Sequence, residues 1–231
     1  MLNFIRNLTD PWYLLQLLMT IPIVLFSLTI HECSHGYFAY RLGDPTARNL
    51  GRLTLNPVKH LDPIGTIAMV LFGIGWAKPV PINTRYFKKP KRDMALTALA
   101  GPVSNFLLSF IVFAIGAVVN EFIPYDSIAA VFVLQWIMLF SYLNLYLAVF
   151  NLIPIPPFDG SRIAFALLPD KVYFGVMKYE RIIMLVMLIL LMWGLFSGPL
   201  QLLTGGMTEL YIKLFSLIPF FDRIGNLVAF I

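Results

Sequence analysis

Little in this sequence suits a water-soluble protein. Only 13% of its 231 residues are charged, and no polar stretch is long enough to form a separate soluble domain. Hydrophobic residues make up 59% of the chain, and its mean hydropathy is +0.80. A soluble core of this size could not bury so much apolar surface. The composition therefore predicts one membrane domain with short loops.

Cysteine is scarce, and the basic residues are absent from one long interval. Cys33 is the single cysteine, which excludes an intramolecular disulfide. No Lys or Arg lies in 94–161, the interval that holds Glu121 and Asp126, whereas ten of the 17 lie in 41–92. Because cytoplasmic loops collect basic residues, the 41–92 region should lie inside and the turn near Glu121 outside. We attribute the net charge of +5 to basic residues in cytoplasmic loops, and we expect no nucleic-acid partner.

Long apolar runs predict an all-α polytopic membrane protein with about four to five transmembrane helices. We treat residues 1–231 as one domain, with a core at 11–168 and C-terminal helices at 175–231. Pro22 should kink the first span unless neighbours compensate, and any break in the fourth is expected at Gly198-Pro199. The expected spans are 12–40, 94–119, 128–150 and 181–203, with 207–231 either a fifth crossing or an interfacial helix.

The connector between the first two spans is expected to hold a small membrane-associated β-like segment. GRLTL (51–55) alternates like a short strand, and the prolines of AKPVPIN (77–83) favour an extended chain. The apolar stretch 64–76 is too short to span, so a re-entrant or interfacial position is expected.

The first predicted span contains the sequence HECSH at residues 31–35. His31 and His35 are separated by about 400° of helix rotation, so both imidazoles share a face. Such a pair can hold one Zn²⁺, and Glu32 can take a proton from water activated there, as in the H-E-x-x-H arrangement of metalloproteases. Cys33 lies on the opposite face. Polar groups in an apolar span cost several kcal/mol unless paired or metal-bound, which favours zinc over a chance match.

A catalytic zinc site usually needs a third protein ligand. Asp159 is favoured because it follows the third span on the same side as His35, and the prolines before it and Gly160 after it enforce a stiff, non-helical path. The alternative is an ordinary Asp-Gly turn at a helix end. His60 remains a rival ligand, although a solvated loop position is the favoured interpretation for it.

Two asparagines are candidate catalytic residues. Asn105 and Asn151 are expected at similar depths near the cytoplasmic side, where a buried amide could donate to the oxyanion of a tetrahedral intermediate. Hydrogen bonding between helices is an equally open interpretation for both. For Asn144, which shares a helical face with Asn151, hydrogen bonding is favoured.

Three motifs together resemble the site-2 protease family of intramembrane zinc metalloproteases: HECSH, GPVSN (101–105) and NLIPIPPFDG (151–160). YRLGDPTARNLGRLTLNP (40–57) resembles the compact bacterial and archaeal branch, and the resemblance covers about 11–168. It implies one Zn²⁺ per chain, held by His31, His35 and Asp159, with Glu32 as catalytic base and acid. Many members carry a PDZ or CBS domain, for which this sequence has no soluble stretch of sufficient length.

The expected function is zinc-dependent hydrolysis of peptide bonds within or near transmembrane segments, as in regulated intramembrane proteolysis. We expect a multi-pass protein of the cell membrane whose active site lies near the cytoplasmic side and whose partners are the lipid bilayer and a transmembrane protein substrate. Two alternatives are a metal-ion transporter and an inactive protein that binds membrane helices. A transporter would need a polar relay through the other spans, and the intact HECSH with Asp159 argues against inactivity.

Overall fold

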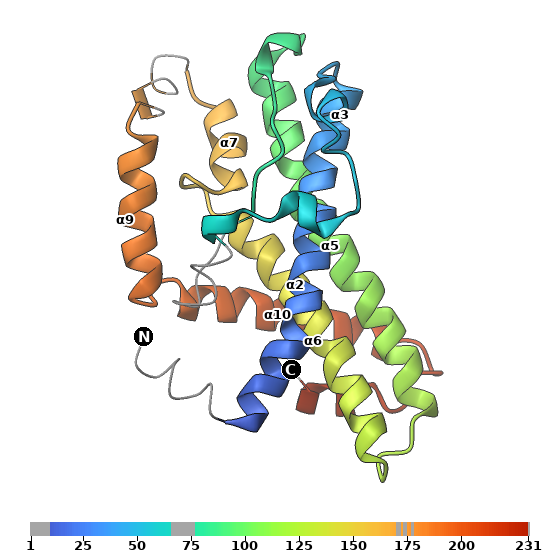
Figure 1. The fold of residues 1–231 in the computed structure, drawn as a ribbon. Helices are drawn as coiled ribbons and strands as arrows, with labels where there is room; N and C mark the ends of the chain where they lie inside the picture. The colour runs from blue at the N-terminus through green and yellow to red at the C-terminus, as the bar shows by residue number, and fades with distance from the viewer. Residues whose placement is uncertain (1–9, 66–76, 170–171, 173–174, 177, 231) are drawn as a thin grey trace. The chain divides into compact units, whose positions relative to one another are not determined.

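A computed structural model describes residues 10–65, 77–169, 172, 175–176 and 178–230. The described residues are mostly helical, and the chain divides into two compact units, Met1–Gly101 and Pro102–Ile231. The boundary falls inside helix α5 (Pro90–Phe122), which contributes its first turns to one unit and the rest to the other (Figure 1).

Three helices among the described residues are long and apolar enough to cross a membrane. They are Tyr13–Arg41, Pro90–Phe122 and Ile128–Asn151. These correspond to the first three predicted spans, and each helix exceeds or matches the length expected from the apolar run. The chain is therefore a helical membrane protein, as predicted. The described residues hold three candidate spans, and the expected count of four to five is not confirmed.

In the first unit, α2 (Pro11–Arg41) carries the HECSH sequence, and α3 (Thr46–Asn49) and the 3₁₀ helix η1 (Pro57–His60) pack against it (Figure 1). The chain leaves α2 at Gly43, whose φ of 108° favours glycine. A second 3₁₀ turn, η2 (Thr84–Tyr86), precedes α5. The connector thus returns along α2 before the second span begins.

The expected β-like segment is not confirmed. Residues 51–55 form turns and bends, and the described residues show one isolated antiparallel bridge, between Leu61 and Ala77, and no strand. The carbonyl of Thr54 accepts hydrogen bonds from Cys33 Sγ (2.9 Å) and His60 Nε2 (2.8 Å), so side chains satisfy an acceptor that a strand ladder would use. Most of the apolar stretch 64–76 lies outside the described residues.

In the second unit, α6 (Ile128–Asn151) is followed by α7 (Asp159–Ala166), α9 (Glu180–Met192), α10 (Ser197–Ser216) and the 3₁₀ helix η3 (Ile224–Phe230). The predicted helix 181–203 is interrupted, and the break lies earlier than Gly198-Pro199. Gly194 adopts a φ of 73°, and Ser197 Oγ donates to its carbonyl (2.6 Å). Gly198 and Pro199 instead lie in the first turn of α10, where proline is tolerated. Figure 1 shows α10 crosswise to α9.

The core of the second unit contains a group of packed aromatic rings. Phe113, Tyr211 and Phe215 are buried together, and the Phe113 ring lies 5.3 Å from Tyr211 and 5.4 Å from Phe215 between centroids. α10 thereby packs along α5 and α6, which binds the C-terminal region to the second and third helices. α10 is not among the candidate spans of the described chain, so both alternatives for 207–231, a fifth crossing and an interfacial helix, stay predictions.

A polar group, which we call the Arg223 cluster, joins the C-terminal region to the turn between α5 and α6. Asn120 Nδ2 donates to the carbonyl of Arg223 (2.9 Å), and the Arg223 main-chain N–H donates to Glu121 Oε1 (3.1 Å). The Arg223 guanidinium lies 4.2 Å from the ring centroid of Tyr125, whose hydroxyl donates to Asn120 Oδ1. Asn226 Nδ2 completes the cluster with a bond to the Tyr125 hydroxyl (3.3 Å).

Candidate metal centre

His31 and His35 lie one turn apart on α2, and both are buried, with exposed fractions of 5% and 7%. Their Nε2 atoms are 3.0 Å apart, and the ring planes are perpendicular. Two nitrogen ligands of a tetrahedral zinc ion at about 2.0–2.1 Å would be about 3.3 Å apart. The pair therefore fits two ligands of one metal ion.

The orientation of His35 is set from α5. Its Nδ1 lies 2.7 Å from the carbonyl oxygen of Thr97, and because that oxygen only accepts, Nδ1 must carry the proton. The lone pair of the neutral ring is then on Nε2, the atom that faces His31.

Gly101 provides the space that the two imidazoles occupy. A Cβ atom at this position would lie 2.5 Å from Cε1 and Nε2 of His35 and 2.6 Å from Cε1 of His31. These approaches are shorter than van der Waals contact, so any larger residue would displace both rings. The glycine that opens GPVSN thus leaves the space in which both imidazoles lie.

Glu32 is adjacent to His31 and is half-buried. Its Oε2 accepts a hydrogen bond of 2.8 Å from the main-chain N–H of Val80, in the connector before α5. The carboxylate is therefore held by a main-chain group rather than by a basic side chain. This contact was not predicted from the sequence.

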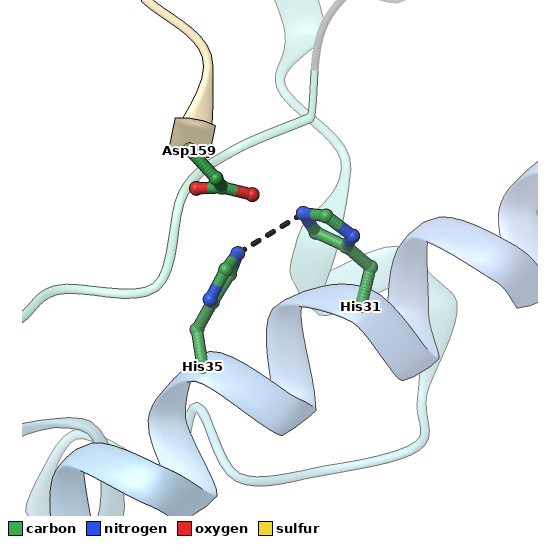
Figure 2. Close-up of side chains that lie close together, drawn as sticks. All are labelled: His31, His35 and Asp159. Atoms are coloured by element: carbon green, nitrogen blue, oxygen red, sulfur yellow. Dashed lines mark hydrogen bonds between the residues drawn. The ribbon is translucent and has the colours of Figure 1, made fainter. Parts of the chain in front are cut away.

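Asp159 is the first residue of α7. Figure 2 draws its carboxylate together with His31 and His35, the group of three predicted ligands. Within the second unit, a Cβ at Gly160 would lie 2.2 Å from the carbonyl oxygen of Leu152, so only glycine fits after Asp159. The chain is thus close-packed at Gly160, but the predicted non-helical path is wrong for these two residues, because Asp159 and Gly160 begin helix α7.

His60, the rival ligand, does not belong to this group. The prediction of a solvated loop position for it is wrong, since His60 is only 2% exposed. Burial is possible because Nε2 donates to the Thr54 carbonyl (2.8 Å) beside Cys33 Sγ. Cys33 binds the same carbonyl and is likewise outside the metal-ligand group.

The asparagines form hydrogen bonds with helical partners. Asn105 Nδ2 donates to Asn144 Oδ1 (3.1 Å), which links α5 to α6, and Asn144 Nδ2 donates to the carbonyl of Phe140 (2.9 Å). Asn151 Nδ2 donates to the carbonyl of Leu147 in its own helix (2.9 Å). The Asn105 bond matches the interpretation of pairing between helices, whereas the Asn151 bond lies within one helix and does not. The catalytic roles of Asn105 and Asn151 stay predictions.

Several known proteins are similar in sequence to the part of this chain that contains the motifs described above. The profile of Peptidase family M50 matches residues 19–133 and 122–194. A Bacillus subtilis protein named "Putative zinc metalloprotease YwhC" is 41% identical over 210 residues, which cover 90% of this chain and 95% of that protein. "Zinc metalloprotease MJ0392" of Methanocaldococcus jannaschii is 31% identical over 197 residues, 84% of this chain and 46% of the longer relative.

No solved structure gives a significant match to the chain. The family profile nevertheless spans both the histidine pair on α2 and the bend that carries Asp159. The relative from Bacillus subtilis has nearly the same length, so the likeness is not confined to one motif. On these grounds the chain belongs to peptidase family M50, the site-2 protease family.

Proposed function

We propose that this protein is an intramembrane zinc endopeptidase of the site-2 type, which hydrolyses peptide bonds within or near transmembrane segments of other membrane proteins. The observation that carries the proposal is the pair of buried imidazoles, with Nε2 atoms 3.0 Å apart, on a helix that is apolar enough to cross a membrane. Zinc is the metal supported by the family and by the names of the relatives.

His31, His35 and Asp159 are the proposed zinc ligands. Two imidazoles and one carboxylate make a donor set of the kind used by catalytic zinc, which leaves a fourth position for the reactants. A bound zinc ion supplies Lewis acidity: it polarises the scissile carbonyl and lowers the pKa of water to about 7. The Thr97 carbonyl supports this role, because it keeps the proton of His35 on Nδ1.

Glu32 is the proposed general base and acid. Its carboxylate takes a proton from the attacking water and later gives that proton to the nitrogen of the leaving amine, so that one oxygen of the substrate carbon comes from water and the C–N bond breaks. The neighbouring position of Glu32 and His31 in HECSH supports this assignment. Asn105 and Asn151 are proposed as donors to the oxyanion, although the bond from Asn105 to Asn144 competes with that role.

A transmembrane substrate must unwind before its carbonyls can be attacked, since a helix satisfies them internally. We propose that residues 77–83 receive the unwound segment alongside their extended main chain, with main-chain carbonyl oxygens as acceptors, because the Val80 N–H is bound to Glu32. The support is local: 78–83 forms neither helix nor strand, Pro79 and Pro81 disfavour helix, and the segment is bound to Glu32 through Val80. The bilayer and a single-span protein are thus the proposed partners.

The proposed location is the cell membrane, with a multi-pass topology and the site near the cytoplasmic side. His35 lies close to the C-terminal end of α2, and the basic residues of 41–92 follow that end directly. The site would then need only a short path for water.

The test is a cleavage assay with zinc-loaded protein and single-span substrates in proteoliposomes. We expect cleavage, located by mass spectrometry within or near the span, that a chelator abolishes and zinc restores. Glu32→Gln should retain zinc, as measured by metal analysis, and lower kcat by about 10²–10⁴-fold because the general base is lost. An emptied zinc site in Glu32→Gln would contradict the role given to Glu32, and zinc-independent turnover would contradict the proposal as a whole.

A further inference from the structure

We propose that Val80 is a positioning residue for the catalytic carboxylate, and that it acts through its main-chain N–H rather than its side chain. The inference rests on the proposed function, because it concerns how Glu32 is held for proton transfer. It assigns a role to the Pro-Val-Pro sequence at 79–81, which lies far from HECSH in the sequence.

Proline leaves this stretch with a single donor. Neither Pro79 nor Pro81 has a main-chain N–H, so Val80 supplies the one amide hydrogen of residues 79–81. That hydrogen is donated to Glu32 Oε2 over 2.8 Å. A hydrogen bond to an ionised carboxylate is stronger than a neutral one, so the contact can fix the carboxylate's orientation.

Both ends of the segment are anchored by other residues of the first unit. At the start, the Lys78 N–H donates to the carbonyl of His60 and Arg52 Nη2 donates to the carbonyl of Lys78, each over 2.8 Å. At the end, the Asn83 N–H donates to Oδ2 of the fully buried Asp44 over 2.6 Å. The position of Val80 is therefore set from both sides.

The side chain of Val80 fixes the direction in which the main-chain N–H of this residue points. It is 5% exposed, and its Cγ1 would lie 3.0 Å from a Cβ at Gly36. Gly36 is one turn beyond Glu32 on α2, so the valine packs against the same face of the helix that carries the carboxylate. Seating the isopropyl group there directs the N–H toward Glu32.

The two carboxylate oxygens of Glu32 therefore have different roles. Oε2 is bound by Val80, which leaves Oε1 for the proton that comes from water and goes to the leaving amine. A carboxylate held in one orientation needs no rearrangement between the two transfers. Loss of the N–H should therefore slow the chemical step without weakening substrate binding.

The first test compares two variants at the same position. Val80→Pro removes the N–H, whereas Val80→Ala keeps it and removes most of the side chain. We expect kcat of Val80→Pro to be at least about tenfold below that of Val80→Ala, with similar KM and zinc content, because misplacement of a catalytic group by 1 Å can cost about 100-fold. Equal kcat values in the two variants would overturn the inference.

The second test does not depend on turnover or on the folding of Val80→Pro. Hydrogen exchange is measured on full-length protein in detergent, in peptides covering 79–81, where Val80 is the single exchangeable amide. We expect this amide to exchange at least about tenfold faster in Glu32→Ala than in the wild type, since its acceptor is gone. Asp62→Ala is the matched control: Asp62 accepts from Gly65 N–H (2.8 Å), so its loss should leave Val80 unchanged.

Equal exchange of Val80 in Glu32→Ala and the wild type would overturn the inference even if the wild type is an active protease. Conversely, a wild type that cleaves no membrane substrate would overturn the proposed function, while faster exchange in Glu32→Ala would still establish the contact. The two failures are thus distinguishable.

Discussion

The Arg223 cluster and the metal centre, two of the polar clusters among the described residues, differ in how their groups interact. In the Arg223 cluster, donors are paired with acceptors. The Asn120 amide donates to the carbonyl of Arg223, and the Arg223 main-chain N–H donates to the Glu121 carboxylate. The Arg223 guanidinium lies over the Tyr125 ring. In the metal centre, two nitrogens of the same kind face each other at 3.0 Å. Burial of polar groups is common to both, so burial alone does not mark a functional site. Like ligand atoms that converge are the distinguishing sign.

The largest expected effect comes from removal of a proposed ligand. Asp159→Ala should empty the zinc site and lower activity by at least about 10³-fold, because the metal supplies several kcal/mol of transition-state stabilisation. Glu121→Ala removes a carboxylate from the Arg223 cluster and should keep its zinc while it destabilises the fold by about 1–3 kcal/mol. Metal analysis and thermal unfolding of the purified variants measure the two effects.

The same measurement decides between Asp159 and His60. His60→Ala should retain zinc, because His60 Nε2 is bonded to the Thr54 carbonyl. Zinc lost from His60→Ala but retained by Asp159→Ala would reverse the ligand assignment.

A smaller effect is expected when the space around the imidazoles is reduced. Gly101→Ala would place a Cβ 2.5 Å from His35 and 2.6 Å from His31, so both rings must move. We expect zinc affinity to fall by about 10–100-fold, the cost typical of losing a group that orients ligands. A competition titration with a zinc chelator would measure it.

Gly116→Ala is the matched control for this prediction. Gly116 lies on the same helix, and its Cβ would meet only the side-chain ends of Ile137 (3.0 Å) and Met138 (3.1 Å). Its zinc affinity should equal that of the wild type. If the two variants bind zinc equally well, clearance at Gly101 does not position the histidines.

The first three spans were predictable because length and hydropathy alone determine a crossing. The expected runs 12–40, 94–119 and 128–150 lie within α2, α5 and α6. The prediction of a fourth continuous helix was wrong because a turn interrupts it. Gly194 turns the chain with a positive φ between apolar residues, and a hydropathy pattern does not reveal such a turn. GRLTL failed as a strand because side chains of Cys33 and His60 bind its Thr54 carbonyl.

The side chains of the site were easier to predict than the groups that hold them. The spacing of His31 and His35 follows from helix geometry, and their adjacency in the structure confirms it. Thr97 and Val80 act through main-chain atoms, which every residue has. The types of their side chains therefore could not indicate these roles. The prolines at 79 and 81, on either side of Val80, are a trace that sequence reasoning could have followed.

The smallest expected effect concerns Asn105, which has features of both clusters, since it is a fully buried amide bonded to a neighbouring helix. A double-mutant cycle of Asn105→Ala and Asn144→Ala should give a coupling energy of about 0.6 kcal/mol and no more than about 1.7 kcal/mol, as for other hydrogen bonds between membrane helices. Unfolding in mixed micelles measures the stabilities. If the bond is purely structural, the two single variants lower kcat to a similar degree, because each breaks the same contact. A kcat lower by about 10²–10³-fold in Asn105→Ala alone would instead identify an oxyanion donor, and Asn105 would then belong with the metal centre.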